Sequence, residues 1–187
     1  MMKKILLVVG IVVAILLVVI ALQADTYRVT RSATIGAPPE VVFEQINDFH
    51  NWEAWSPWAK LDPAVKNTFE GAPSGAGSVF KWAGNSQVGE GMMTLTESRP
   101  TERIRIKLDF IKPFPSTCDT AFDFASGPAG VTVTWTMSGN NNFISKAFCL
   151  FMGGMDRMIG PDFERGLKQM KAAAEQKKPV EPAAAKS

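Results

Sequence analysis

The sequence predicts an α+β domain in which a curved antiparallel sheet of about six to seven strands wraps a long C-terminal helix. It also predicts one transmembrane helix ahead of that domain. Three observations point to this fold class: an uncharged N-terminal run, a central stretch of alternating apolar and polar residues, and a C-terminal stretch with helical spacing. A chain of 187 residues is long enough for one domain with a well-formed core.

The N-terminal run covers residues 5–22, and none of its 18 side chains is charged or polar. As a helix, this run spans roughly 27 Å, close to the roughly 30 Å hydrocarbon core of a bilayer. A cleaved signal peptide is the alternative, with its best cleavage site after Ala24, but its apolar region is typically about 7–15 residues long. We therefore expect an uncleaved membrane anchor over residues 1–24.

Charges on either side of the run predict its orientation. Lys3 and Lys4 precede it, which favours a cytoplasmic N-terminus and a domain on the exported side, periplasmic or extracellular. Arg28 and Arg31 follow it and leave only a small margin. The domain is expected over residues 25–176, and a disordered tail with two prolines and an alanine run is expected over 177–187.

The net charge of +2 equals the contribution of Lys3 and Lys4, so the rest of the chain is neutral. A neutral domain argues against a nucleic-acid partner, because such binding depends on clustered lysine and arginine. His50 is the only histidine, which excludes a multi-histidine metal site, and we expect neither a metal nor a cofactor. Cys118 and Cys149 are interpreted as buried inert thiols, with a disulfide between them as the alternative in an exported domain.

The expected elements follow a simple order. Residues 27–36 form a strand, Pro38 and Pro39 open a helix, and a second short helix passes through Trp52 and Trp55. Alternating residues then predict six strands, at 65–70, 78–83, 89–97, 103–110, 117–124 and 131–137. A helical stripe runs from Ile144 to Met170, with a kink expected at Gly160-Pro161. Alternation indicates a sheet with one solvent-exposed face and one buried face. Only the last helix is long enough to cover the buried face.

Short motifs accompany this order: Ala37-Pro38-Pro39-Glu40, Trp55-Ser56-Pro57-Trp58, Gly75-x-Gly77, Gly89-x-Gly91, Lys112-Pro113-Phe114 and Asp162-Phe163-Glu164. Together they resemble the START-like helix-grip superfamily, in particular its polyketide cyclase/dehydrase-type (SRPBCC) proteins, over about residues 27–176. The resemblance implies a cavity between the curved sheet and the last helix, open to a small apolar ligand. It does not imply an activity, because one fold carries many functions.

Side chains on the inward parity are the candidate ligand contacts, because aromatic and methionine side chains suit apolar pockets. A solid core is the alternative, since parity alone cannot separate a lined cavity from packed side chains. The candidate ligand-binding residues are Trp55, Trp58, Phe80, Trp82, Met93, Phe110, Phe122, Phe124, Trp135, Met137, Phe151 and Met155.

Catalysis has only one weak candidate, Glu97. It shares its parity with Met93 and Leu95, and a carboxyl group in an apolar site can serve as an acid or base. A surface ion pair with Arg99 is the alternative reading of the same residue. His50 is interpreted as an exposed turn residue.

The leading hypothesis is a membrane-anchored binding module for an apolar small molecule or lipid, held in the membrane by residues 5–22. One alternative is an enzyme of polyketide cyclase or dehydratase type. Another is a protein-interaction domain with a filled core.

Overall fold

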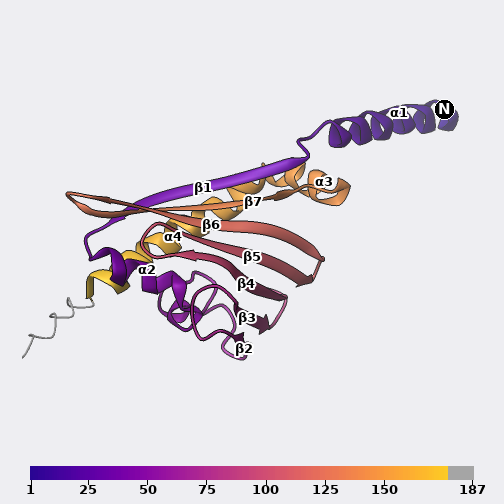
Figure 1. Ribbon diagram of the computed structural model, residues 1–187. Helices are drawn as coiled ribbons and strands as arrows, with labels where there is room; N and C mark the ends of the chain where they lie inside the picture. The colour runs from indigo at the N-terminus through magenta and orange to yellow at the C-terminus, as the bar shows by residue number, and fades with distance from the viewer. Residues whose placement is uncertain (177–187) are drawn as a thin grey trace, which may run out of the picture.

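The computed structural model describes residues 1–176, in which a long N-terminal helix projects from a seven-stranded domain (Figure 1). The disordered tail expected over 177–187 lies outside the described residues. In chain order the elements are α1 (Met2–Ala21), β1 (Thr26–Ile35), α2 (Pro39–Asn47), the 3-10 helix η1 (Phe49–Ala54), β2 (Lys66–Gly71), β3 (Ser78–Ala83), β4 (Glu90–Arg99), β5 (Arg103–Lys112), β6 (Ser116–Gly127), β7 (Gly130–Asn140), α3 (Phe143–Met152) and α4 (Met155–Gln176).

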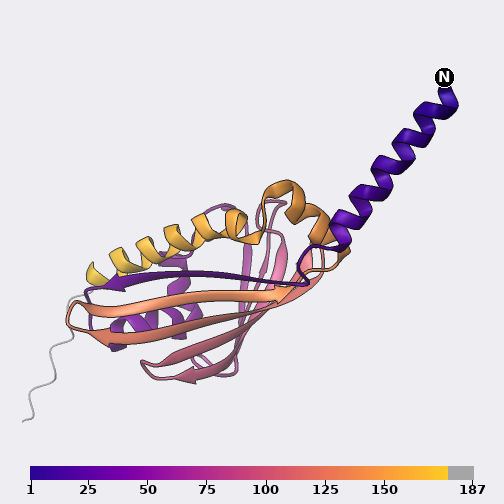
Figure 2. The same cartoon turned by 90° about the horizontal axis from the view of Figure 1, so that it is seen from above.

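The helix α1 has 20 residues and a mean hydropathy of 3.2, and Ile20 is its one buried residue. It leads away from the domain in each view (Figure 2), so its apolar surface is not covered by the described part of the chain. A helix of this length and composition can cross a membrane, and a signal sequence near the N-terminus meets the same criteria.

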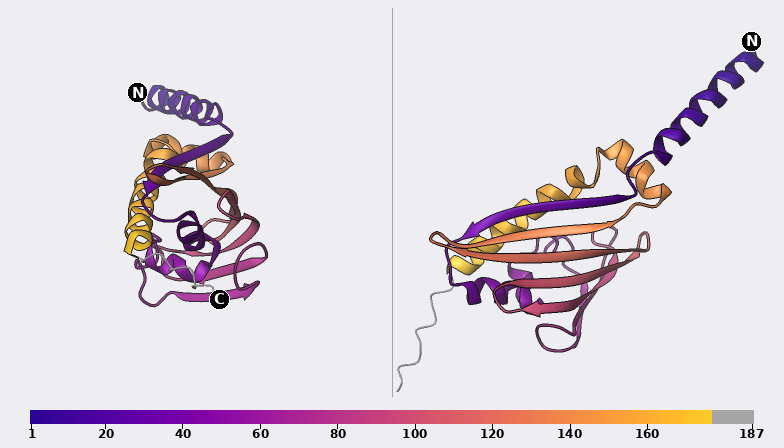
Figure 3. Two further views of the ribbon diagram at one scale, coloured as in Figure 1. Left: turned by 60° about the vertical axis from the view of Figure 1, so that its left-hand side comes forward. Right: turned by 45° about the horizontal axis from the view of Figure 1, so that its top comes forward.

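All seven strands form one antiparallel sheet in the order β1-β7-β6-β5-β4-β3-β2. The sheet curves around α2 and η1, and α4 runs along its concave side (Figure 3). This arrangement confirms the α+β fold class and the helix-grip architecture. We call the end of the sheet where β1 begins the α1 end, with the turns at 84–89 and 113–115. The opposite end, with the turns at 72–77, 100–102 and 128–129, is called the α2 end.

The C-terminal helical stripe is interrupted earlier than expected. The helix is not broken at Gly160-Pro161, where a kink is expected, because α4 continues through Pro161. The break instead lies at Gly153 and Gly154, whose φ angles of 83° and 92° are left-handed. Glycine adopts this conformation without the penalty that a Cβ imposes, so it ends α3 and redirects the chain into α4.

The side chain of Arg31 on β1 fastens α4 to the sheet. Its Nε lies 2.7 Å from Glu164 Oε1, and its Nη1 lies 2.8 Å from Asp156 Oδ1. These hydrogen bonds hold the pKa of Asp156 below its ordinary value. A Cβ on Gly160 would lie 2.1 Å from Arg31 Nη2, so a larger residue there would displace the guanidinium from this position.

The outer face of the sheet is polar, as alternation predicts. Side-chain hydroxyls pair across β1 and β7, for example Ser32 with Thr134 at 2.9 Å. Across β5 and β6, Arg103 Nε pairs with Asp123 Oδ1 at 2.5 Å. The inner face therefore carries the core, and any apolar ligand site belongs to that side.

Candidate ligand-binding site

The centre of the inner face is filled by stacked aromatic rings. Trp135 on β7 lies parallel to Phe163 on α4, with ring centroids 3.8 Å apart and an interplanar angle of 8°. Phe122 on β6 also stacks on Trp135, with ring centroids 5.0 Å apart. Trp55 contacts both Phe122 and Trp135 edge-on. Because Trp135 is only 2% exposed and Phe163 only 1%, this region is packed core.

The buried tryptophans of this region differ in whether their indole N–H has a hydrogen-bond acceptor. Trp52 Nε1 and Trp55 Nε1 donate hydrogen bonds to the carbonyls of Ile46 and Gln45, at 3.0 Å and 2.7 Å. Within residues 1–176, the buried Nε1 of Trp135 has no acceptor. An unpaired buried donor costs about 1–3 kcal/mol of stability.

The α2 end of the inner face is covered by α2. Phe124 packs against Phe43 of α2 with ring centroids 5.4 Å apart. Ile35 and Val131 are buried beside them. Phe124 itself is half-buried, so this end is covered but not fully closed.

The α1 end is different, because its inward side chains are only half-buried. They are supplied by β3, β5 and the start of α4, with Trp58 following η1. They pack against the core on one side and remain partly accessible on the other: Trp58, Phe80, Trp82, Leu108, Phe110, Met155 and Ile159.

Two glycines leave the inner face of the sheet without a side chain at this end. The ring of Trp82 lies across Gly91 on β4, where an added Cβ would stand 2.5 Å from the ring. Tyr27 covers Gly139 on β7, where a Cβ would stand 2.7 Å from its hydroxyl. Each glycine leaves room for a neighbouring aromatic ring to pack closely against the strand. The sequence analysis did not include Tyr27, and the glycine opposite it was the available signal.

Two inward polar side chains at the α1 end, Tyr27 and Cys118, are neutral. Burial raises the pKa of Cys118 to about 11 and also raises the pKa of Tyr27, so both remain protonated at neutral pH. Cys118 and Cys149 are free, with Cys118 buried and Cys149 half-buried. Within residues 1–176, no three His, Cys, Asp or Glu side chains gather as a metal site. The surroundings at this end suit an uncharged, apolar molecule.

The predicted ligand-binding residues therefore divide into three groups. Trp55, Met93, Phe122, Trp135 and Met137 are buried in the packed core, and Trp58, Phe80, Trp82, Phe110, Phe124 and Met155 are half-buried. Phe151 does not line the interior at all, which corrects its predicted position. It is 71% exposed, because the break at Gly153-Gly154 turns α3 away from the sheet.

Glu97 also lies elsewhere than its parity predicts. Between Leu95 and Glu97 the register with β5 shifts, so Glu97 pairs with Arg105 on the outer face. Its carboxylate lies 2.5 Å from Arg99 Nε and 3.1 Å from Arg105 Nε. The expected inward position of Glu97 is wrong, and the ion pair with Arg99 is present. A general acid or base at this position would have no apolar site around it.

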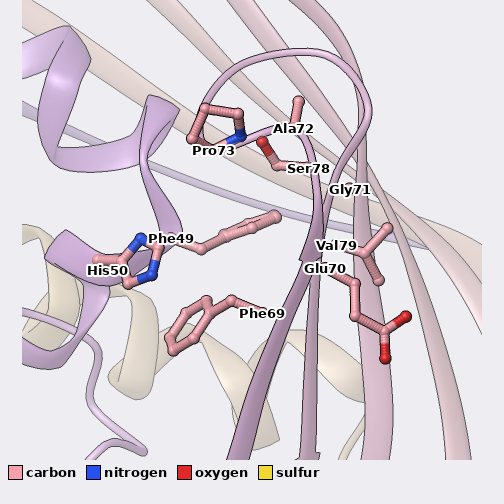
Figure 4. A pocket seen from close by; sticks show the side chains of 9 residues that line it. All are labelled: Phe49, His50, Phe69, Glu70, Gly71, Ala72, Pro73, Ser78 and Val79. Carbon is pink, nitrogen blue, oxygen red and sulfur yellow. The ribbon is translucent and has the colours of Figure 1, made fainter.

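An open pocket of about 240 Å³ lies at the other edge of the sheet, between η1 and the β2–β3 turn. Figure 4 shows Phe49, His50 and Phe69 converging on it. His50 stacks on Phe69 at 4.0 Å and hydrogen-bonds Asp48 through Nδ1 at 2.7 Å. The pocket falls below the roughly 300–1,000 Å³ of small-molecule sites, so it is the weaker candidate.

Comparison with known families identifies the class of protein. The family model described as "Polyketide cyclase / dehydrase and lipid transport" matches residues 26–175, and the chain belongs to this family. The resemblance read from the sequence motifs is thereby confirmed. No match was found among the curated proteins.

Solved structures share the fold at low identity. Protein CV1439 from Chromobacterium violaceum is 19% identical with a TM-score of 0.56, over 81% of this chain and 97% of that one. Protein SA2116 from Staphylococcus aureus, described as of unknown function, is 10% identical with a TM-score of 0.59, over 81% and 94%. The di-domain ARO/CYC StfQ from the steffimycin biosynthetic pathway is 12% identical with a TM-score of 0.57, over 81% of this chain and 51% of StfQ.

Proposed function

We propose that this protein is a membrane-anchored binding module that holds an apolar small molecule or lipid at the α1 end of its inner face. The observation that carries the proposal is the group of half-buried aromatic and aliphatic side chains there, beside a centre that is fully packed. A ligand covering Phe80, Trp82 and Phe110 would gain about 25 cal/mol for each Å² of apolar surface removed from water.

Two further features support a lipid-like ligand. The family description includes lipid transport. The helix α1 is long and apolar enough to hold the domain beside a bilayer, with its N-terminus on the cytoplasmic side and the domain on the exported side. Tethering would raise the local concentration of membrane lipids at the ligand site.

One observation favours a second candidate, a protein-interaction domain with a filled core. The centre is packed and the α2 end is covered by α2, so a fully filled domain differs from the proposal mainly at the α1 end. The family description also names polyketide cyclase and dehydrase, but the carboxylate considered for an enzyme faces outward between two arginines.

Photocrosslinking tests the proposal. Full-length protein is placed in nanodiscs containing phosphatidylcholine with a diazirine in its acyl chain, and adducts are mapped by peptide mass spectrometry. We expect adducts on the inward residues of β3 and β5 and at the start of α4, in addition to α1. Adducts confined to α1 and α3 would contradict the proposal and favour the filled core.

A matched pair of variants locates the site. Leu108→Trp adds bulk to the half-buried inner surface, and Lys107→Trp adds the same bulk to the outer face one residue away. We expect Leu108→Trp to reduce adducts on β3 and β5 severalfold while adducts on α1 stay unchanged. Lys107→Trp should leave all adducts unchanged, and circular dichroism melting confirms that both variants fold.

A further inference from the structure

The short helix α3 is fastened to the point where α1 meets the domain. Lys146 Nζ donates to the carbonyl of Ala21, at the C-terminal end of α1, over 3.2 Å and pairs with Asp25 at 2.5 Å. Just before α3, Asn141 Nδ2 donates to the carbonyl of Ala24 at 3.1 Å. These contacts place α3 at the level where α1 ends, as Figures 1 and 3 show.

The outward side of α3 is apolar. Its one charged residue, Lys146, is turned toward α1 and is 9% exposed. Ile144 is 66% exposed and Phe151 is 71% exposed, and the complete set of exposed large apolar side chains is Phe143, Ile144, Phe148, Phe151 and Met152. Five such residues on one 10-residue helix form a surface that water does not favour.

The length of α3 excludes a second membrane span. Ten residues of helix reach about 15 Å, half of the roughly 30 Å hydrocarbon core. A short helix with exposed phenylalanines and isoleucine can instead lie in the plane of the interface, with its apolar side among the outer parts of the acyl chains.

The geometry points to α3 as an interfacial membrane helix that lies in the same bilayer surface from which α1 emerges. This inference rests on the proposed membrane anchor, because α1 sets the level at which α3 meets the lipid. Lys146 holds the two helices together at that level, and its ammonium reaches the polar boundary at Asp25. The half-buried side chains of the α1 end then face the membrane surface, which gives a lipid a short path to Trp82 and Phe110.

Fluorescence quenching of the full-length chain in phosphatidylcholine vesicles tests the inference. An environment-sensitive nitrobenzoxadiazole label is attached to Ile144→Cys or Phe151→Cys on α3, in a Cys149→Ser background. Ile11→Cys in the middle of α1 reports the anchor, and Lys107→Cys on the outer sheet face reports water. Nitroxide on acyl carbon 5 quenches from the lipid, and iodide quenches from the aqueous phase.

We expect the α3 labels to be quenched severalfold more by the nitroxide lipid than by iodide, with the reverse at Lys107→Cys. Iodide quenching of the α3 labels at the Lys107→Cys level would overturn the inference, because α3 would lie in water. Shielding from both quenchers would also overturn it, since a second copy or another protein would then cover α3.

The Ile11→Cys label distinguishes a failure of the interfacial helix from a failure of the membrane anchor. If this label is quenched by the lipid while α3 is in water, the interfacial helix fails and the anchor stands. If this label is not quenched by the lipid, the anchor itself fails, and the inference fails with it.

Discussion

The α1 end and the α2 end of the sheet are built from the same strands, yet their inward side chains have different surroundings. At the α2 end, the inward side chains of Ile35 and Val131 are only 0% and 1% exposed. At the α1 end, Phe110 extends from the same face of the sheet and stays half-buried. The pattern of alternation is alike in both, so it is the packing of helices on the inner face that decides how deeply an inward side chain is buried.

The difference traces to two glycines. Gly153 and Gly154 take left-handed conformations that end α3 and start α4 in a new direction. The residues before the break, including Phe148 and Phe151, therefore leave the sheet uncovered at its α1 end. The same break that opens the inner face also exposes an apolar helix beside α1.

Substitutions at matched aromatic positions should show the largest contrast between the centre and the α1 end. Trp135→Ala removes a ring stacked between Phe122 and Phe163, and we expect it to lower the free energy of unfolding by about 3–5 kcal/mol. Phe110→Ala at the α1 end should cost about 1–2 kcal/mol, because the ring is already partly in water. Urea unfolding of the full-length chain in detergent, followed by far-ultraviolet circular dichroism, measures both.

Equal losses of unfolding free energy in the two variants would contradict the contrast between the centre and the α1 end, because Phe110 would then behave as a core residue. A loss close to zero for Phe110→Ala would strengthen the contrast, because the α1 end would then contribute little to stability. Ile104→Ala, at a fully buried position on the same strand as Phe110, serves as the control for a core contact on β5.

A smaller effect is expected at Arg31, which fastens α4 to β1. Its hydrogen bonds lower the pKa of Asp156, so their contribution to stability is present above the ordinary carboxyl value of 3.8 and is lost as pH falls through the lower folded value. Arg31→Gln should therefore be less stable at pH 6 and should lose less further stability between pH 6 and pH 3 than the parent chain. Thermal melts across this range measure the change.

Arg28→Gln, at an exposed position on the same strand, is the control. If it changes the pH dependence as much as Arg31→Gln does, general charge rather than the contact between Arg31 and α4 sets the pH response.

The sequence predicts much of the fold and less of the site, for physical reasons. Alternation identifies which residues of 103–110 and 131–137 face inward, because the strand period of two is regular. It failed at Glu97, because a shifted register between Leu95 and Glu97 turns the side chain over without any sequence signature. It failed at Phe151, because helical spacing continues through residues where glycine redirects the backbone.

The candidate site depends on which inward residues are covered, and this is a tertiary property. The alternation in their strands predicts that both Trp135 and Phe110 point inward, but only Trp135 packs against α4. The glycines opposite Trp82 and Tyr27 were visible, and their role became clear only from the strand register that pairs them.

Native mass spectrometry of the full-length chain, extracted from its own membranes in a mild detergent without delipidation, tests the central claim most directly. The account predicts a discrete added mass that stays on the parent chain and on Lys107→Trp and is absent from Leu108→Trp. A bare protein mass for the parent chain, or an added mass that survives in Leu108→Trp, would contradict a ligand site at the α1 end of the sheet.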